Sequence, residues 1–286
     1  IQFKKNKKIV ITSDSISENI DFFKNDDPKS IARKILTINL SDLSAMGATP
    51  HSYLLNIFIP KYIDTSWFKI FTSELLRVQK KYKFYLLGGD LSSSKELSIT
   101  ATFLGLSKYN KIVSQNLVSI NDDIWITGNI GDSFVGLQIL KKKIKVKKNL
   151  KSYFLKKYLY PKPFLHGVKF TKYAQSMKDI SDGFVGDLSK MLNGKYGAKI
   201  NTNILPLSSN LKKIYNNSYI NKNILNSGDN YDLIIISNQK NRKKILNIAK
   251  KNNLKITLVG KVTKNLQIVN DSNKPLNIHR EYDHFL

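Results

Sequence analysis

Hydrophobic residues follow two spacings along this chain, one of which predicts helices and the other strands. The helical spacing predicts helices at residues 28–46, 65–82, 133–140, 141–157, 165–176, 184–192 and 242–251. Short β-branched or alternating runs predict strands at residues 8–11, 51–59, 84–87, 97–104, 124–128, 198–203, 233–237 and 256–262. This interleaving of strands and helices predicts an α/β (α+β) protein.

Residues 108–123 are polar and irregular, which is typical of a domain boundary. The chain has 286 residues, 41% of them hydrophobic, which is enough for two packed cores. We therefore expect one domain at residues 1–115 and a second at residues 116–286.

The helix predicted at 28–46 begins with Asp27 as its cap and Pro28 in its first turn, where proline fits. It is apolar around most of its circumference, so we expect it to be buried. Asn39 and Asp42 nevertheless fall on one of its isoleucine stripes. An ionised carboxylate there is costly unless it is paired or binds a metal. Asp42 is therefore a candidate metal ligand, and an Asp bonded to backbone N–H groups or to a lysine is the alternative.

Two predicted strands deliver polar residues at their carboxyl ends. Ser13 and Asp14 follow the first strand, and Asp90 follows Gly88 and Gly89 after the third. Loops at strand ends carry ligand groups in α/β proteins, and glycines let the backbone approach a bulky ligand closely. These residues are candidates for binding a nucleotide phosphate with its cation, although ordinary turns use the same residue types.

Asp179 and Asp182 lie three residues apart, with Ser181 between them and Gly183 behind. A helix is predicted to follow, which Ser181 or Asp182 could cap. The free N–H groups of its first turn favour an anion, but carboxylates beside an anion repel it unless cations lie between them. Because Mg²⁺ takes oxygen ligands from Asp residues and from phosphates, this segment indicates a metal-bridged phosphate. A simple N-cap is the alternative.

The formal net charge of +26 suggests nucleic acid or an anionic membrane as a partner. The lysines are spread over the whole chain, however, and no recognised nucleic-acid-binding module accompanies them. A dedicated nucleic-acid surface is therefore disfavoured, and attraction of a small polyanion is an equally good use of the charge. The chain has no cysteine and no stretch of 18 apolar residues, which favours a cytoplasmic protein without membrane contact.

Familiar catalytic motifs are missing from the sequence. There is no Gly-x-x-x-x-Gly-Lys-Ser/Thr phosphate loop, no Gly-x-Gly-x-x-Gly after a strand and no His-Glu-x-x-His. With four histidines in the chain, the candidates for chemistry are carboxylates.

Seven short segments match, in order, those of a known family. They are Thr12-Ser13-Asp14, residues 39–48, Gly88-Gly89-Asp90, Thr127-Gly128 with Gly131-Asp132, residues 179–183, residues 228–233 and residues 282–285. On these segments the chain resembles thiamine-monophosphate kinase, a member of the superfamily that includes aminoimidazole ribonucleotide synthetase. The strings 39–48 and 179–183 are the most specific.

The resemblance implies transfer of the γ-phosphoryl group of ATP, as co-substrate, onto thiamine monophosphate, which yields thiamine diphosphate. It implies several Mg²⁺ ions held by Ser13, Asp14, Asp42, Asp90, Asp179 and Asp182. It implies ATP contacts from Gly89, Asp90, Gln115 and Ser181, and thiamine monophosphate contacts from Asp21, Asp229 and Tyr282. Phosphoryl transfer asks the protein mainly to position and neutralise two anions, so carboxylate-held metals suffice without a general base.

The resemblance also implies an architecture. We expect an N-terminal mixed-sheet domain of the aminoimidazole ribonucleotide synthetase type, which binds ATP and metal and forms a homodimer, followed by a C-terminal α+β domain.

The sequence departs from the family at four places. The first acidic motif of the family, Gly-Asp-Asp-Ala, is expected before Ile1 and is not in this sequence, so at least one metal ligand is missing from it. Asp21 stands where the family has a substrate-contacting His, and Gln115 where it has an ATP-contacting Arg. Asp229-Asn230 replaces Glu-Asp. We expect these changes to alter substrate affinity.

Two alternatives stay open. An aminoimidazole ribonucleotide synthetase-like enzyme belongs to the same superfamily, although we expect Glu in place of Asp90 there. A basic nucleic-acid-binding protein explains the charge but not the carboxylates. Selenophosphate synthetase and the hydrogenase maturation protein are disfavoured, because they need a cysteine or selenocysteine.

Overall fold

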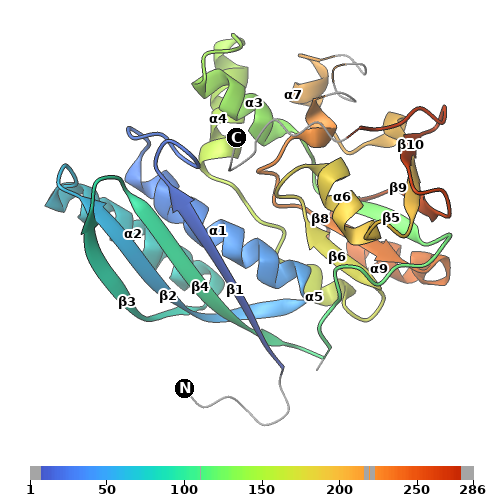
Figure 1. Ribbon diagram of the computed structural model, residues 1–286, viewed down its shortest axis with the longest axis horizontal. Coiled ribbons are helices and arrows are strands. Elements are labelled where there is room, and N and C mark those ends of the chain that lie inside the picture. The colour runs from blue at the N-terminus through green and yellow to red at the C-terminus, as the bar shows by residue number, and fades with distance from the viewer. Residues whose placement is uncertain (1–7, 110, 216–218, 220–222, 278–286) are drawn as a thin grey trace.

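Two β-sheets with helices packed on them form the part of the chain that the computed structural model describes, residues 8–109, 111–215, 219 and 223–277 (Figure 1). The fold class predicted from the sequence is confirmed. No helix within these residues is long and apolar enough to cross a membrane. The cytoplasmic location stays a prediction.

The first sheet has four strands in the order β1-β4-β2-β3. The strands are β1 (Ile9–Ser17), β2 (Ala48–Pro60), β3 (Tyr85–Ser94) and β4 (Ser98–Ser107). β2 and β3 are parallel and the other pairs antiparallel, so the sheet is mixed, as the resemblance implied. Helices α1 (Pro28–Ala45) and α2 (Thr65–Tyr82) cover one face of it (Figure 1).

Helices α1 and α2 begin where the sequence predicted. The Asp27 side chain accepts a hydrogen bond from the N–H of Lys29 and caps α1. The Asp64 side chain accepts one from the N–H of Trp67 and caps α2. Such caps satisfy N–H groups that have no partner inside the helix. α1 is buried along most of its length, as its apolar circumference predicted.

The second sheet has six strands in the order β10-β7-β9-β5-β8-β6. Its strands are β5 (Asp123–Thr127), β6 (Ser176–Asp179), β7 (Gly197–Ile200), β8 (Leu233–Ser237), β9 (Ile256–Thr263) and β10 (Ile268–Asn270). The helices are α3 (Asp132–Leu140), α4 (Lys148–Leu159), α5 (Gly167–Phe170), α6 (Phe184–Leu192), α7 (Ser209–Lys212) and α9 (Arg242–Lys251). Short 3₁₀ turns lie at Thr202–Ile204, Ile224–Asn226 and Gln239–Asn241.

This second sheet has a core on both faces. Ile124 and Ile126 of β5 pack with α3 and α6, whereas Trp125 between them packs with Ile245 of α9. Alternate side chains of a strand point to opposite faces, so a continuous apolar run marks a strand covered on both sides. The predicted runs at 124–128 and 233–237 are of this kind.

Two predicted strand ends are wrong. Ser13 and Asp14 lie inside β1, opposite Thr102 and Ala101 of β4, rather than in a loop after it. β3 likewise continues through Gly89 and beyond. In both strands, alternate polar side chains such as Ser13 and Asp90 lie on the uncovered face of the sheet, where polar residues carry no burial penalty, so these strands look like loops in the sequence.

Three other boundaries also differ from the prediction. The helix expected at 165–176 is wrong, because α5 ends at Phe170 and Ser176 already pairs with Ile236 in β8. The helix expected from residue 141 begins at Lys148, since Lys142 has a positive φ that interrupts it. The strand expected at 198–203 ends at Ile200, where a 3₁₀ turn follows.

Gly89→Ala should lower the free energy of unfolding by about 2 to 4 kcal/mol, because a Cβ there would lie 1.7 Å from the carbonyl oxygen of Leu55. Gly88→Ala is the matched control, since no atom lies within 4 Å of its added Cβ, and it should change stability by less than about 0.5 kcal/mol. Urea unfolding measures both. Equal effects of the two substitutions would contradict the close packing of β3 on β2.

Candidate functional site

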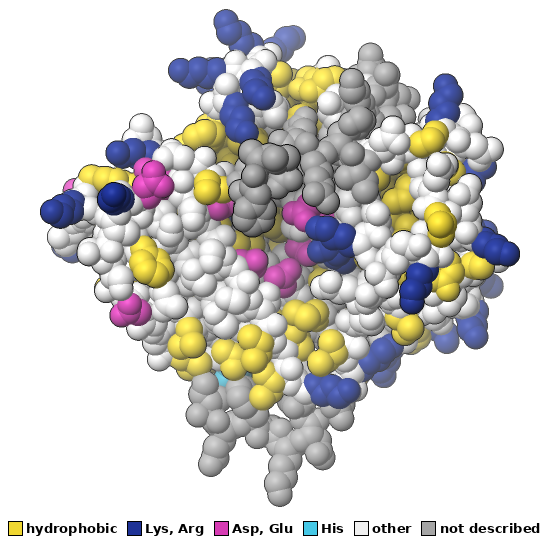
Figure 2. Space-filling model, in the orientation of Figure 1, with side chains coloured by type: hydrophobic (Ala, Val, Ile, Leu, Met, Phe, Trp, Pro, Cys, Tyr) yellow, Lys and Arg dark blue, Asp and Glu magenta, His cyan; other side chains and the backbone are white. Residues whose placement is uncertain are grey.

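Three of the candidate carboxylates meet where the two domains touch. Asp14 comes from β1, Asp42 from α1 and Asp179 from the end of β6. The carboxyl groups of Asp14 and Asp42 lie close enough to shift each other's pKa, and Asp179 is close enough to repel both. Figure 2 shows acidic side chains gathered near the middle of this face. We call Asp14, Asp42 and Asp179 the carboxylate cluster.

Hydroxyl groups orient two members of the cluster. Thr12 Oγ1 donates to Asp42 Oδ2 at 2.5 Å, and Ser41 Oγ donates to Asp179 Oδ2 at 2.9 Å. Ser41 and Asp42 are neighbours on α1, so this helix presents one carboxylate and holds another. Residues 39–48 therefore supply one carboxylate of the first domain and orient another, Asp179, of the second domain.

The cluster carries more negative charge than its surroundings neutralise. Burial, followed by repulsion from Asp14, raises the pKa of Asp42 to about 6. Burial, followed by repulsion from Asp42, raises the pKa of Asp179 to about 7, and burial also raises the pKa of Asp14. Two like charges 4 Å apart repel by about 4 kcal/mol at a protein surface. A bound cation would remove this repulsion.

Lys178 of β6 and Asp187 of α6 support the cluster. The Lys178 ammonium lies 3.8 Å from Asp179 Oδ1 and 3.4 Å from Asp187 Oδ1. Asp187 Oδ2 accepts hydrogen bonds from the N–H groups of Ser181 (3.0 Å) and Asp182 (2.9 Å). The predicted capping role of Ser181 or Asp182 is wrong, since Gly183 precedes α6 and no side chain caps it. Asp187 in the first turn satisfies these N–H groups instead.

The turn at 180–183 packs directly on the loop at 228–232. The N–H of Asp229 donates to the carbonyl of Ser181 at 2.9 Å. Gly183 has a φ of +115°, and a Cβ there would lie 2.5 Å from the backbone of Asn226, so a side chain is excluded on both grounds. The two glycine-containing strings singled out in the sequence are therefore one structural unit.

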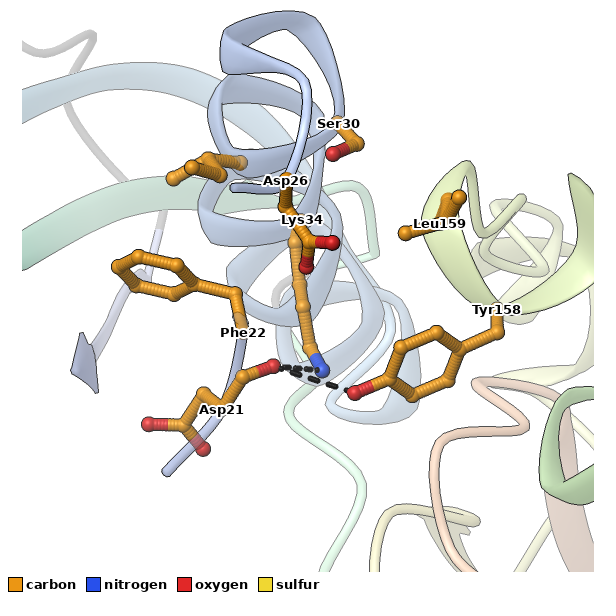
Figure 3. A pocket seen from close by; sticks show the side chains of 8 residues that line it. Asp21, Phe22, Asp26, Ser30, Lys34, Tyr158 and Leu159 are labelled. Atoms are coloured by element: carbon orange, nitrogen blue, oxygen red, sulfur yellow. Dashed lines mark hydrogen bonds between the residues drawn. The ribbon is translucent and has the colours of Figure 1, made fainter. Parts of the chain in front are cut away.

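Asp21 and Asp229, the candidate substrate contacts, meet at Lys34 of α1, and Figure 3 shows the contact with Asp21. The Lys34 ammonium donates to the carbonyl of Asp21 at 2.7 Å and lies 3.4 Å from Asp229 Oδ1. Asp229 also accepts a hydrogen bond from the hydroxyl of Tyr231 at 2.7 Å. Residues more than 200 positions apart in the sequence thus share one cation.

Ser13 and Asp90 lie on the other face of the first sheet, away from the cluster. Ser13 Oγ is 2.8 Å from Thr102 Oγ1, and Asp90 accepts a hydrogen bond from Ser92 Oγ at 2.7 Å. Asp14 lies in the same row of paired residues as Gly89, three strands away, which is about 14 Å. Asp90 follows Gly89 and therefore points to the uncovered face.

The other candidates are more exposed or lie outside the described residues. Asp182 has a side chain 61% exposed and pairs with Lys190. Gln115 is exposed in the link between the sheets, next to the start of β6. Tyr282 lies outside the described residues.

A cavity of about 290 Å³ opens beside Asp229. Its lining combines acidic, basic and aromatic side chains, among them Asp132, Asp229, Asp232, Lys156, Lys157, Lys162, Tyr153 and Tyr160. Asp232 accepts a hydrogen bond from Thr127 Oγ1 at 3.1 Å, and burial raises its pKa to about 7. The cavity therefore offers both signs of charge to a ligand.

Within the described residues, no group of three or more His, Asp or Glu side chains is arranged to hold a metal ion. The cluster nevertheless has the donor chemistry for one, because its oxygens are hard ligands and repel one another. Mg²⁺ stays a prediction at this point.

Two family descriptions match the chain. "AIR synthase related protein, N-terminal domain" matches residues 1–107, and "AIR synthase related protein, C-terminal domain" matches residues 120–269. Thiamine-monophosphate kinase of Buchnera aphidicola (subsp. Schizaphis graminum) is 37% identical over 100% of this chain and 90% of its own length. That of Haemophilus influenzae is 31% identical over 100% and 89%. The chain belongs to the thiamine-monophosphate kinase family.

Solved structures of the kinase family share the fold. The Aquifex aeolicus enzyme superposes with a TM-score of 0.82 at 25% identity, over 95% of this chain and 90% of that one. The Stenotrophomonas maltophilia enzyme gives a TM-score of 0.85 at 24% identity, over 95% and 87%. "AaThiL complexed with AMPPCP and TMP" gives a TM-score of 0.81 at 24% identity, over 96% and 86%.

The sequence motifs and the family resemblance did not identify three residues of this site. Lys34, Lys178 and Asp187 match no expectation stated above. Lys34 had a signal, because it is a charged residue inside a helix predicted to be buried nearly all round. Lys178 had a weaker one, a lysine in a short strand directly before Asp179. Asp187 had none, because an acidic residue in a first helical turn is common.

Asp187→Ala should lower the free energy of unfolding by about 3 kcal/mol, because it leaves two N–H groups without their acceptor and removes the nearer of two carboxylates from the Lys178 ammonium. Asp182→Asn is the matched control in the same turn. Its pair with Lys190 is exposed, so the change should stay within about 1 kcal/mol. Denaturant titration compares the two. A loss for Asp187→Ala no larger than the control's would contradict the assigned role.

Proposed function

We propose that this chain transfers the γ-phosphoryl group of ATP to the phosphate of thiamine monophosphate, which yields thiamine diphosphate. The observation that carries the proposal is the carboxylate cluster, in which Asp14, Asp42 and Asp179 converge from two domains with pKa values raised by burial and by one another. The relatives at 37% and 31% identity are thiamine-monophosphate kinases. The complex of AaThiL holds TMP together with AMPPCP, an ATP analogue. The two alternative functions are therefore set aside.

The carboxylate cluster is the place where Mg²⁺ would be held. Asp14, Asp42 and Asp179 supply hard oxygen ligands, and the metal, when bound, supplies the positive charge that lets two phosphates approach each other. Thr12 and Ser41 keep two of these carboxylates oriented by hydrogen bonds. A phosphate acceptor is already a competent nucleophile, so none of these residues has to remove a proton.

The loop at 228–232 is suited to hold the thiamine end of the acceptor. Thiamine monophosphate joins a cationic thiazolium ring to an anionic phosphate. Asp229 lies between the cluster and the large cavity, whose lining provides carboxylates, lysines and tyrosines. A molecule with both signs of charge therefore finds partners along this path.

We also propose that the chain acts as a homodimer through the uncovered face and edge strands of the first sheet. Large apolar side chains are exposed on this face and at its edges, namely Ile9, Ile11, Leu54, Phe58, Tyr85 and Leu91. Exposed large apolar side chains gathered on one sheet are typical of an interaction site, and β1 and β3 are both edge strands.

A second copy of the chain would also explain why Asp90 points away from the carboxylate cluster. In one chain, Asp90 points away from the carboxylate cluster and is three strands from Asp14. A partner packed on the uncovered face could present its own Asp90 and Gly89 near Ser13 of this chain. Each site of such a dimer takes residues from both copies.

Asp42→Asn should reduce the formation of ADP that depends on thiamine monophosphate by at least about 100-fold, because the cluster loses a ligand charge. The assay is a coupled measurement of ADP with Mg²⁺ in excess. Asp64→Asn, at the cap of α2, is the control and should keep the parent's rate. Full activity of Asp42→Asn would exclude the cluster as the site of transfer.

Asp42→Asn should at the same time stabilise the fold in EDTA at pH 7.5, by about 1 to 3 kcal/mol. Folding raises the pKa of Asp42 from 3.8 to about 6, so the stability of the parent falls as the pH rises through this window and the variant avoids the loss. Mg²⁺ should then stabilise the parent and not the variant, because a ligand that binds the folded state raises its stability. Thermal unfolding with and without Mg²⁺ measures both effects.

Asp42→Asn and Asp90→Asn should complement each other if the site is shared between copies. Each variant alone should be inactive, whereas co-expression at equal amounts should restore about a quarter of the parent's activity, because half of the dimers are mixed and each has one intact site. No recovery, with mixed dimers confirmed by tag-specific purification, would contradict the shared site.

A further inference from the structure

Lys34 is the one lysine among the buried polar side chains of the described residues. It is 7% exposed and extends from α1 toward a small cavity lined by Asp21, Phe22, Asp26 and Tyr158 (Figure 3). An ammonium group is strongly hydrated, so burying it is costly unless it is paired and hydrogen-bonded. The chain therefore has a specific use for a cation at this point.

The partners of Lys34 come from both domains. The ammonium donates to the carbonyl of Asp21 at 2.7 Å, lies 3.4 Å from Asp229 Oδ1 and sits 4.7 Å from the ring centre of Tyr158. Tyr158 also donates from its hydroxyl to the Asp21 carbonyl at 3.3 Å. An ammonium has three N–H donors, and a carbonyl, a carboxylate and an aromatic ring of the protein surround this one. Lys34 is therefore engaged within the protein.

The raised pKa of Lys34 agrees with an ion pair between Lys34 and Asp229. Burial lowers the pKa of Lys34, but attraction to Asp229, Tyr158 and Asp21 outweighs this effect and raises the pKa above its usual value. Lys34 therefore stays charged at neutral pH, where it can pair with the Asp229 carboxylate.

The loop that Lys34 holds is conformationally strained. Asp229 and Tyr231 both have a φ of +58°, in the left-handed region that residues other than glycine rarely adopt. Backbone of this kind persists only where its surroundings fix it. The ion pair with Lys34 is one such restraint, and the hydrogen bond from Tyr231 to Asp229 is another.

We propose that Lys34 is a positioning residue for the acceptor substrate, which ties the Asp21 segment of one domain to the Asp229 loop of the other at a fixed separation. This inference rests on the proposed function, because it takes Asp21 and Asp229 as contacts of thiamine monophosphate. Lys34 acts through these two residues and not by touching the substrate. The carboxylate cluster, which handles the phosphates of ATP, is held separately by Thr12, Ser41 and Lys178.

The test is a kinetic double-mutant cycle. Lys34→Met should raise the KM for thiamine monophosphate by about tenfold or more, while the KM for ATP stays within about twofold. Lys34→Arg keeps the charge with a different reach and should give an intermediate value. Lys34→Met combined with Asp229→Asn should have the same KM for thiamine monophosphate as Asp229→Asn alone, because the two residues act as one unit.

Lys29→Met is the matched control. Lys29 lies on the same helix, is exposed and contributes the same charge, so this variant should leave both KM values unchanged. A structural role alone would instead lower the melting temperature of Lys34→Met and shift both KM values together. If Lys34→Met does not fold, Lys34→Arg with Asp229→Asn completes the same cycle.

Several outcomes would overturn the inference. They are an unchanged KM for thiamine monophosphate in Lys34→Met, an equal shift of both KM values, or effects that multiply in the double variant. A parent that consumes no ATP with thiamine monophosphate would overturn the proposed function instead. In that case, calorimetric titration of thiamine monophosphate in the presence of AMPPCP measures the dissociation constants of the same variants. A failure of the inference about Lys34 is thereby distinguished from a failure of the proposed function.

Discussion

Repulsion between buried carboxylates at the junction of two domains is the constraint on which the rest of this structure depends. Asp14 and Asp42 belong to the first domain and Asp179 to the second, and none of them has a full counter-charge. Such an arrangement lowers stability, and it persists because large apolar cores on either side hold the elements in place. The fold thereby stores an unfavourable interaction that a cation and two phosphates can relieve.

Charge neutralisation around this junction is divided between two lysines with different tasks. Lys178 of β6 lies between Asp179 and Asp187 and pairs with both. Lys34 of α1 pairs with Asp229 of the second domain. The net charge of +26 therefore says little about the site, because most of the lysines lie elsewhere on an accessible surface. The two lysines with low exposure, Lys34 and Lys178, matter more for the site than the net charge of the chain.

Local sequence patterns predicted the elements well where a cap or a long periodic run marked them. Asp27-Pro28 and Asp64 placed the starts of both long helices, and the apolar run at 233–237 placed a central strand. The sequence patterns gave the wrong element where pairing with a distant strand determines the local structure. Ser176 joins a strand because β8 offers it a partner, which no property of residues 165–176 reveals.

The same limit explains what was found and missed at the site. Asp42 stood out in the sequence because a carboxylate inside an apolar helix needs an explanation, and the same reasoning applied to Lys34 would have found it too. The face on which Asp90 lies follows from strand register, which depends on three neighbouring strands. The sequence motifs therefore identified the candidate carboxylates. That Asp90 lies apart from the carboxylate cluster could be seen only in the folded sheet.

Helix α1 links the two halves of the site in a way that bears on the size of acceptable substrates. Lys34 and Asp42 are eight positions apart on it, which corresponds to about 12 Å along its axis. A buried helix neither stretches nor shortens, so backbone geometry sets the gap between the carboxylate cluster and the Asp229 loop that we propose to hold the acceptor. We therefore expect a compound whose ring and phosphate are one bond too close or too far apart to fit this gap poorly, without any side chain that opposes it.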